Sequence, residues 1–147
     1  MSKLNDFKAH VTGIASMDFE HSHLLKQLER MYQASSFEDA KVGVDGFIEA
    51  WKLHHGHEDQ LMQDIAFPGA AAHIEGHSRL YEIYHRLRDD ALQGGGTLSS
   101  AKAYIDMVAQ LVCEHIRHYD VQYADWAKLH CTPQQIALLG FKHPPMA

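Results

Sequence analysis

The 147-residue sequence has little cysteine and no block of positive charge. Cys113 and Cys131 are too few and too irregularly spaced for a disulfide framework or a cysteine-based zinc site. Lysine and arginine total 13 and form no stripe, and the net charge is -6 with histidine neutral. A chain of this kind is not expected to have a nucleic-acid partner or to bind an anionic membrane surface.

Long hydrophobic runs are also missing. No stretch approaches the roughly 18 apolar residues that a membrane helix needs. The first ten residues lack the apolar segment of a secretory signal. We therefore expect a cytoplasmic protein with no membrane span. Internal repeats and low-complexity segments are absent from the sequence as well.

Histidine, in contrast, is abundant, with 13 residues, whereas the hydrophobic share of 46% and the charged share of 22% are ordinary. A chain of this length forms one domain with one core. We expect a single domain over residues 1–147, with an arm at about 1–13, a bundle at about 14–128, and a short helix and tail at 129–147. A monomer is favoured over an oligomer, and the sequence identifies no protein client.

Apolar residues recur with helical spacing in four long segments, and no strand pattern competes with them. Serines, a Phe-Pro-Gly turn and three consecutive glycines separate the segments, which lie at about 16–34, 36–65, 70–93 and 99–128. A short fifth helix is predicted after Thr132, because Pro133 would occupy its first position. The sequence thus predicts an all-α protein, an antiparallel up-down-up-down four-helix bundle with an N-terminal arm and a short C-terminal helix.

A dense polar stretch, WKLHHGHEDQLM, lies in the second predicted helix at residues 51–62. At 100° per residue, His54 and Glu58 are about 40° apart and lie in the middle of the apolar stripe. A buried, unpaired carboxylate is costly, so Glu58 requires a positive partner or a metal ion. His55 and His57 fall at the two edges of the stripe, and His57 and Asp59 are expected to be solvated.

Each of the other predicted helices also directs at least one imidazole inward. His21 is central on the first, His73 and His77 are spaced i, i+4 on the third, and His115 is central on the fourth. Asp120 follows His115 by five residues, which places it about 140° away on a regular α-helix. A π-bulge would bring these two side chains to one face, and we predict such a bulge here.

Any one of these histidines alone is better explained as a core residue that is hydrogen-bonded to a neighbour. Their coincidence on the buried stripes of four helices favours a metal site. Five imidazoles and two carboxylates are too many ligands for one metal ion and suit two. If both carboxylates and a solvent oxygen bridge two six-coordinate ions, one coordination position stays open. Nitrogen and oxygen ligands without thiolate favour iron or manganese, although ligand type alone does not exclude zinc.

Five motifs together resemble the hemerythrin family in its bacterial form. They span about residues 13–127 and read MDFEH (17–21), HHGHEDQLM (54–62), FP (67–68), HIEGH (73–77) and HIRHYD (115–120). The resemblance implies a four-helix bundle that holds two iron ions bridged by an oxo or hydroxo group. It assigns His73, His77 and His115 to one iron, His21 and His54 to the other, and Glu58 and Asp120 as bridges.

The resemblance also implies a function. Dioxygen would be the ligand, bound reversibly at the open position of the iron held by His21 and His54, for oxygen carriage, storage, delivery or sensing. Five neutral imidazoles supply less negative charge than the ligands of carboxylate-rich diiron enzymes, which favours reversible binding over oxygen activation. We therefore expect a binding protein and not an enzyme. The alternatives are a diiron enzyme that reduces peroxide or nitric oxide, and iron storage or detoxification.

The expected oxygen pocket departs from the family pattern at one position. The residue after the second-helix histidine is usually phenylalanine in the family, and it is His55 here. Val112 and Ile116, which flank His115, are expected to complete the pocket wall. Two interpretations of His55 stay open at this stage: its imidazole contacts bound oxygen, or it turns to solvent at the edge of the stripe.

Overall fold

The computed structural model describes residues 11–93 and 95–140, and these residues form helices without any strand. The predicted all-α class is therefore confirmed for this part of the chain. Most of the predicted arm and tail, residues 1–10 and 141–147, lies outside the described residues, as does Gly94. The elements are α1 (Ala15–Tyr32), α2 (Phe37–Asp64), α3 (Ala70–Leu92), α4 (Leu98–His115), the π-helix η2 (Ile116–Asp120), α5 (Val121–His130) and α6 (Pro133–Leu138).

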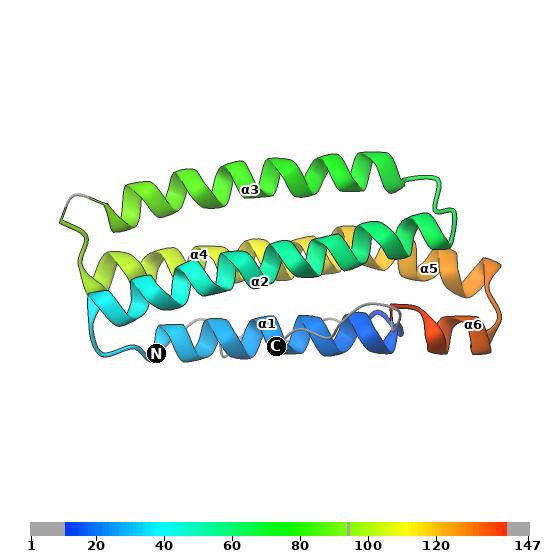
Figure 1. Ribbon diagram of the computed structural model, residues 1–147, viewed down its shortest axis with the longest axis horizontal. Helices are drawn as coiled ribbons and strands as arrows, with labels where there is room; N and C mark the ends of the chain where they lie inside the picture. Colours follow the sequence, from blue (N-terminus) through cyan, green and yellow to red (C-terminus); the bar gives the residue numbers. More distant parts are fainter. Residues whose placement is uncertain (1–10, 94, 141–147) are drawn as a thin grey trace.

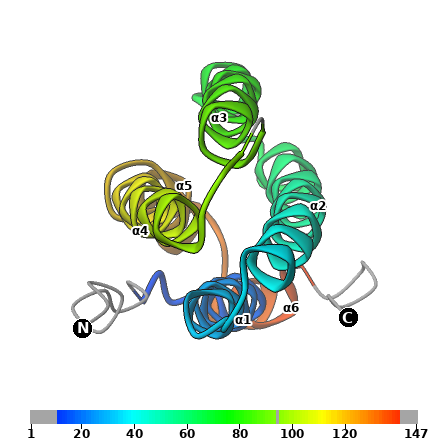
Figure 2. The same cartoon turned by 90° about the vertical axis from the view of Figure 1, so that its left-hand side faces the viewer.

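The long helices lie side by side as a bundle. Consecutive long helices run in opposite directions in Figure 1, and α4, η2 and α5 follow one another along a single rod. Seen from the end, α1, α2, α3 and α4 surround a common interior (Figure 2). The short α6 folds back beside the start of α1, where the Ser16 hydroxyl donates a hydrogen bond of 2.7 Å to the Leu139 carbonyl. None of the described helices has the length and apolar character needed to span a membrane.

Local sequence fixes several helix ends. The Ser36 hydroxyl accepts a hydrogen bond from the Asp39 backbone N–H, which caps α2 at the start of the segment predicted at 36–65. At the start of α4, Thr97 and Ser100 form a reciprocal capping box. Thr132 caps α6 in the same way, with proline at the first helical position as predicted. These caps set where each helix begins, and so which residues face inward.

Two apolar clusters fill different parts of the bundle interior. On α1 and α2, polar residues lie between the two clusters in the sequence. On α1, His21 lies between the buried Met17 and Leu24. On α2, both His54 and Glu58 lie between the buried Trp51 and Leu61. The larger cluster includes Leu24, Phe47, Trp51, Tyr84, Ile105 and Val112, and the smaller includes Ile14, Met17, Leu61, Met62 and Tyr123. The polar residues are thus held in a low-dielectric interior with apolar packing on both sides.

Candidate metal centre

The structure brings all seven predicted ligands together. They form two overlapping groups, each with ligand atoms within 4.8 Å of one another, and every member is buried. One group contains three histidines and the other contains two, and both groups contain Glu58 and Asp120. We call the first the three-histidine half (His73, His77 and His115) and the second the two-histidine half (His21 and His54).

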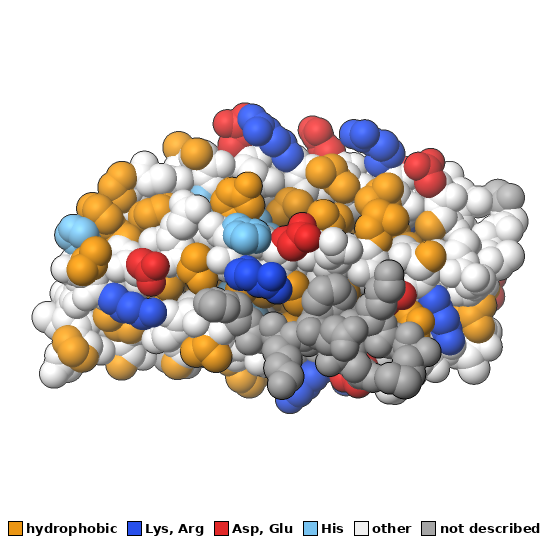
Figure 3. Space-filling model, turned by 180° about the vertical axis from the view of Figure 1, so that it is seen from behind, with side chains coloured by type: hydrophobic (Ala, Val, Ile, Leu, Met, Phe, Trp, Pro, Cys, Tyr) orange, Lys and Arg blue, Asp and Glu red, His pale blue; other side chains and the backbone are white. Residues whose placement is uncertain are grey.

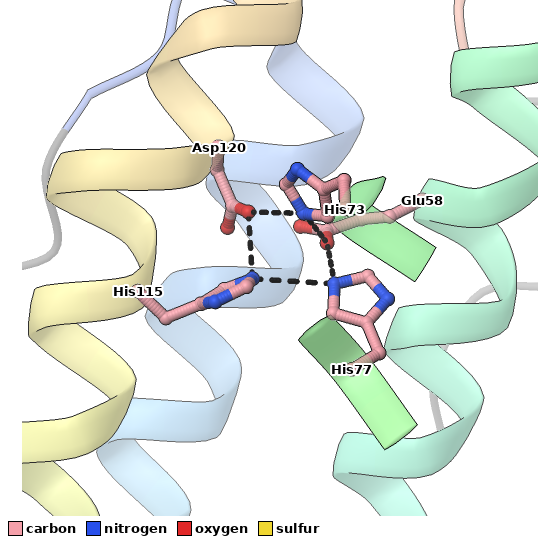
Figure 4. A group of neighbouring side chains, drawn as sticks. All are labelled: Glu58, His73, His77, His115 and Asp120. Carbon is pink, nitrogen blue, oxygen red and sulfur yellow. Dashed lines mark hydrogen bonds and ion pairs between the residues drawn. The ribbon is translucent and has the colours of Figure 1, made fainter. Parts of the chain in front are cut away.

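In the three-histidine half, the ring nitrogens converge on one oxygen from each carboxylate (Figure 4). His77 Nε2 lies 3.2 Å from Glu58 Oε2, and His115 Nε2 lies 3.0 Å from Asp120 Oδ1. His73 Nε2 lies 3.2 Å from the same Asp120 oxygen and 3.7 Å from the same Glu58 oxygen. The Nε2 atoms of His77 and His115 are 3.2 Å apart. Helices α2, α3, α4 and η2 all contribute to this half.

The two-histidine half uses the other oxygen of each carboxylate. His54 Nε2 lies 2.9 Å from Glu58 Oε1, and His21 Nε2 lies 3.2 Å from that same oxygen. His21 Nε2 is also 3.1 Å from Asp120 Oδ2. Glu58 and Asp120 therefore each present one oxygen to one half and the second oxygen to the other. This is the arrangement expected of carboxylates that bridge two metal ions.

The donor atoms of the cluster fit metal ions better than they fit one another. Several lie at ion-pair distance from a neighbour without forming a hydrogen bond, although they are buried; these atoms are His54 Nε2, His73 Nε2, Glu58 Oε2, and Asp120 Oδ1 and Oδ2. A buried polar atom that has no hydrogen-bond partner is costly. Nitrogen and oxygen atoms that converge in this way can be satisfied by shared cations, so the residues present fit a metal centre.

The electrostatics of the cluster also favour positive charge at its centre. Burial opposes ionisation of Glu58, but the charge on His54 and the contacts with the His21 and His54 rings hold the pKa of that carboxyl well below its usual range. Burial likewise opposes protonation of His54, yet the charge on Glu58 and a hydrogen bond to Glu20 raise its pKa to about 10. For His73, the close contacts with the Asp120 and Glu58 carboxylates outweigh burial and raise the pKa to about 9. Protons on the imidazoles or metal ions can supply this positive charge.

Carboxylates outside the seven residues orient the histidine rings. Glu20 Oε1 accepts a hydrogen bond of 2.9 Å from His54 Nδ1, and Glu20 Oε2 lies 2.8 Å from His57 Nδ1. On the other side, Asp59 Oδ1 accepts a hydrogen bond of 2.9 Å from His77 Nδ1. Because an ionised carboxylate only accepts, each Nδ1 must donate. The neutral rings of His54 and His77 then direct their Nε2 lone pairs at the cluster.

These contacts correct part of the sequence interpretation. His57 is 6% exposed, so the prediction that it is a solvated edge residue is wrong. Asp59 was also predicted to be solvated, but its side chain is only 31% exposed and is bonded to His77. Glu20 was not singled out at all. Its signal was weak: at 100° per residue it lies about 60° from Met17, at the edge of the buried stripe.

We predict that Glu20→Gln weakens metal binding in the two-histidine half. Residues that hydrogen-bond to metal ligands typically contribute about 10–100-fold in affinity, because they fix the ring orientation and strengthen its basicity. The measurement is an anaerobic titration with ferrous iron in competition with a chelator. Glu29→Gln, at an exposed position of the same helix, is the matched control and should bind as the parent does. Equal affinities for all three proteins would contradict the role of Glu20.

The predicted π-bulge is confirmed. Residues 116–120 form the π-helix η2, and the Val121 backbone N–H donates to the Ile116 carbonyl, five residues earlier. This wider turn brings Asp120 onto the face of His115, and the Asp120 side chain is completely buried. A regular α-helix would have placed that carboxylate about 140° away from His115.

A pair of length variants tests the bulge. Because η2 contains one residue more than a regular turn, deleting the exposed His118 restores α-helical spacing and keeps Asp120 facing His115. Inserting an alanine after His118 adds about 100° and turns the carboxylate away. We expect the deletion variant to keep two iron ions per chain and the insertion variant to lose them, with similar helical content by circular dichroism. The reverse order of iron contents would contradict this account of η2.

No family model matches the chain. A curated bacteriohemerythrin from Stenotrophomonas maltophilia (strain R551-3) is 29% identical over 127 residues, which cover 80% of this chain and 77% of the relative. This similarity supports the hemerythrin resemblance. The seven residues that the resemblance assigns as ligands are the same seven that the structure brings into one buried cluster able to hold metal.

His55 occupies the position where hemerythrins usually have phenylalanine, and its placement is now defined. Its ring is 2% exposed and stacks on His77, with ring centroids 3.7 Å apart and planes at 4°. The interpretation in which His55 turns to solvent is therefore wrong. Burial, followed by the charge on His77, lowers the pKa of His55 well below its ordinary value, so the ring is neutral. Val112 and Ile116 are fully buried, and their role in an oxygen pocket stays a prediction.

Proposed function

We propose that this chain is a member of the hemerythrin family that binds two iron ions in the buried cluster and binds dioxygen reversibly there. The observation that carries the proposal is the division of both carboxylates between two histidine groups, one oxygen to each. The two-histidine half has one imidazole fewer than the three-histidine half. That half is the place where a small ligand finds an open position.

The iron pair would supply the two electrons that dioxygen takes up on binding and gives back on release. The chain's own residues keep this exchange reversible. Five neutral imidazoles and two carboxylates bring only two negative charges to the centre, which disfavours higher iron oxidation states. The Tyr123 hydroxyl donates a hydrogen bond of 3.1 Å to Glu58 Oε1 and fixes that carboxylate. Trp51, Val112 and Ile116 are fully buried and exclude water from the interior.

A second candidate function is reduction of peroxide or nitric oxide at the same centre. One observation favours it: both ring nitrogens of His55 are buried without a hydrogen-bond partner, next to the ligand His77. A neutral imidazole can donate a hydrogen bond to a reacting oxygen. Iron storage is less consistent with the cluster, because its protein ligands suit two ions only.

Cycling between oxygen and vacuum distinguishes these functions. The protein is loaded with ferrous iron without air, oxygen is admitted and then removed, and the visible charge-transfer band is followed. A band that appears and disappears over repeated cycles supports reversible binding. Colour that forms once, followed by a ferric form and turnover of added peroxide or nitric oxide, supports the enzyme. A protein that takes up no iron contradicts both functions.

A further inference from the structure

The two halves of the cluster differ in their contact with solvent. His73 is 8% exposed and His115 is 6% exposed. His21 and His54 have no exposed surface, and the same holds for the shared carboxylate Glu58. Solvent can therefore touch the cluster at the three-histidine half, whereas the two-histidine half is enclosed by protein.

The exposed edge of the three-histidine half opens into a groove. This cavity, which we call the α3–α4 groove, has a volume of about 440 Å³ and is lined by residues of α3, α4, η2 and α5 and of the turn before α3, with His73 and His115 among them. Leu80, Ile83 and Leu111 form the apolar wall, and the polar groups come from Glu114, Gln122 and Arg79. The Arg79 guanidinium is paired with the Glu75 carboxylate. Figure 3 shows a band of apolar side chains on this face, below the charged outer edge of α3. The groove is large enough for a hydrated cation or a small chelator.

The side of the two-histidine half away from the shared carboxylates is closed by ion pairs. Glu20 contacts both His54 and His57, and it is only 5% exposed. An ion held there could reach solvent past the shared carboxylates and the three-histidine half, or by separation of α1 from α2 and α4, the helices packed against it. Separating these helices breaks their buried contacts, so local opening there has a high free-energy cost.

We propose that metal ions enter and leave through the α3–α4 groove, and that the three-histidine half exchanges its ion with solvent faster than the two-histidine half does. The inference rests on the proposed function only in requiring that two divalent cations bind. The two ions would thus differ in their rate of exchange with solvent, although they lie in the same buried cluster. A chelator that removes metal would first produce a chain holding one ion, in the two-histidine half.

A substitution at Gly76 can block the groove. It lines the groove, and a Cβ added there would meet no atom within 4 Å. A phenylalanine at this position fills groove space, and replacing glycine inside a helix is favourable to helix stability. Gly56 on α2 is the matched control: a Cβ there also meets no atom within 4 Å, the position is exposed, and it is not among the groove residues.

The test loads the protein with two ferrous ions without air and adds an excess of a chromogenic ferrous chelator. We expect two release phases of one ion each. Gly76→Phe should slow the fast phase by about tenfold, which corresponds to ~1.4 kcal/mol of added barrier. Gly56→Phe should leave both phases unchanged. Release in one phase, or equal rates for the two variants, would overturn the groove as the route while leaving the diiron site in place. A protein that binds no iron would overturn both.

Discussion

Glu58→Gln is expected to lose both iron ions and not just one. Its two carboxylate oxygens face different halves of the cluster, with Oε1 2.9 Å from His54 Nε2 and Oε2 3.2 Å from His77 Nε2. The substitution removes a shared anionic ligand and leaves two cations close together with less negative charge between them. Residues that only support a ligand already contribute about 10–100-fold, so the loss of affinity here should exceed about 100-fold.

The measurement for this variant is iron per chain after anaerobic loading and removal of excess metal. Glu49→Gln changes an exposed glutamate on the same helix and should keep two ions. Circular dichroism should show that both variants remain helical. If Glu58→Gln retains one tightly bound ion, Glu58 serves one half only and the bridging role is wrong.

His54→Leu is expected to keep one iron ion and to lose dioxygen binding. The three-histidine half retains its three imidazoles and both carboxylates in this variant, whereas the two-histidine half keeps His21 alone. Leucine has a volume suited to the apolar surroundings of a fully buried position next to Trp51. A single ferrous ion would supply only one of the two electrons that dioxygen takes up on reversible binding.

Iron content and the oxygen-dependent visible band are measured together for this variant. His118→Leu, at an exposed position of η2, is the control and should retain two ions and the reversible band. A His54→Leu protein that still binds two ions, or that still cycles with oxygen, would show that His54 is not a ligand.

The helix pattern and most of the cluster were predictable because both depend on periodicity within one helix. The predicted segments at 36–65 and 70–93 became α2 and α3 with ends shifted by a residue or so. The inward faces of His54 and Glu58 follow from the same 100° rule. Even the irregular turn at Asp120 was predictable, because a carboxylate five residues after a buried histidine fits no regular helix.

The contacts that sequence reasoning missed all join the edges of neighbouring helices. Periodicity places Glu20 at one edge of the α1 stripe and His57 at one edge of the α2 stripe. It does not give the rotation of α1 relative to α2, and that rotation decides whether the two edges meet as a buried ion pair or face solvent. The stacking of His55 on His77 depends in the same way on how α2 and α3 pack.

The buried imidazole of His55, which forms no hydrogen bond, is expected to lower the stability of the metal-free protein. Two ring nitrogens without hydrogen-bond partners carry a desolvation cost of about 1–3 kcal/mol each. His55→Phe keeps a flat ring between Trp51 and His77 and removes this cost, so the metal-free variant should be more stable by about 1 kcal/mol or more in urea unfolding. A variant less stable than the parent would show that His55 has a partner in solution.

The most direct measurement of the central claim is the anomalous diffraction signal of crystals of the iron-loaded protein at the iron absorption edge. We predict two iron peaks inside the bundle, one among His73, His77 and His115 and one beside His21 and His54, with Glu58 and Asp120 reaching both. A single peak, or peaks only at exposed histidines, would contradict it.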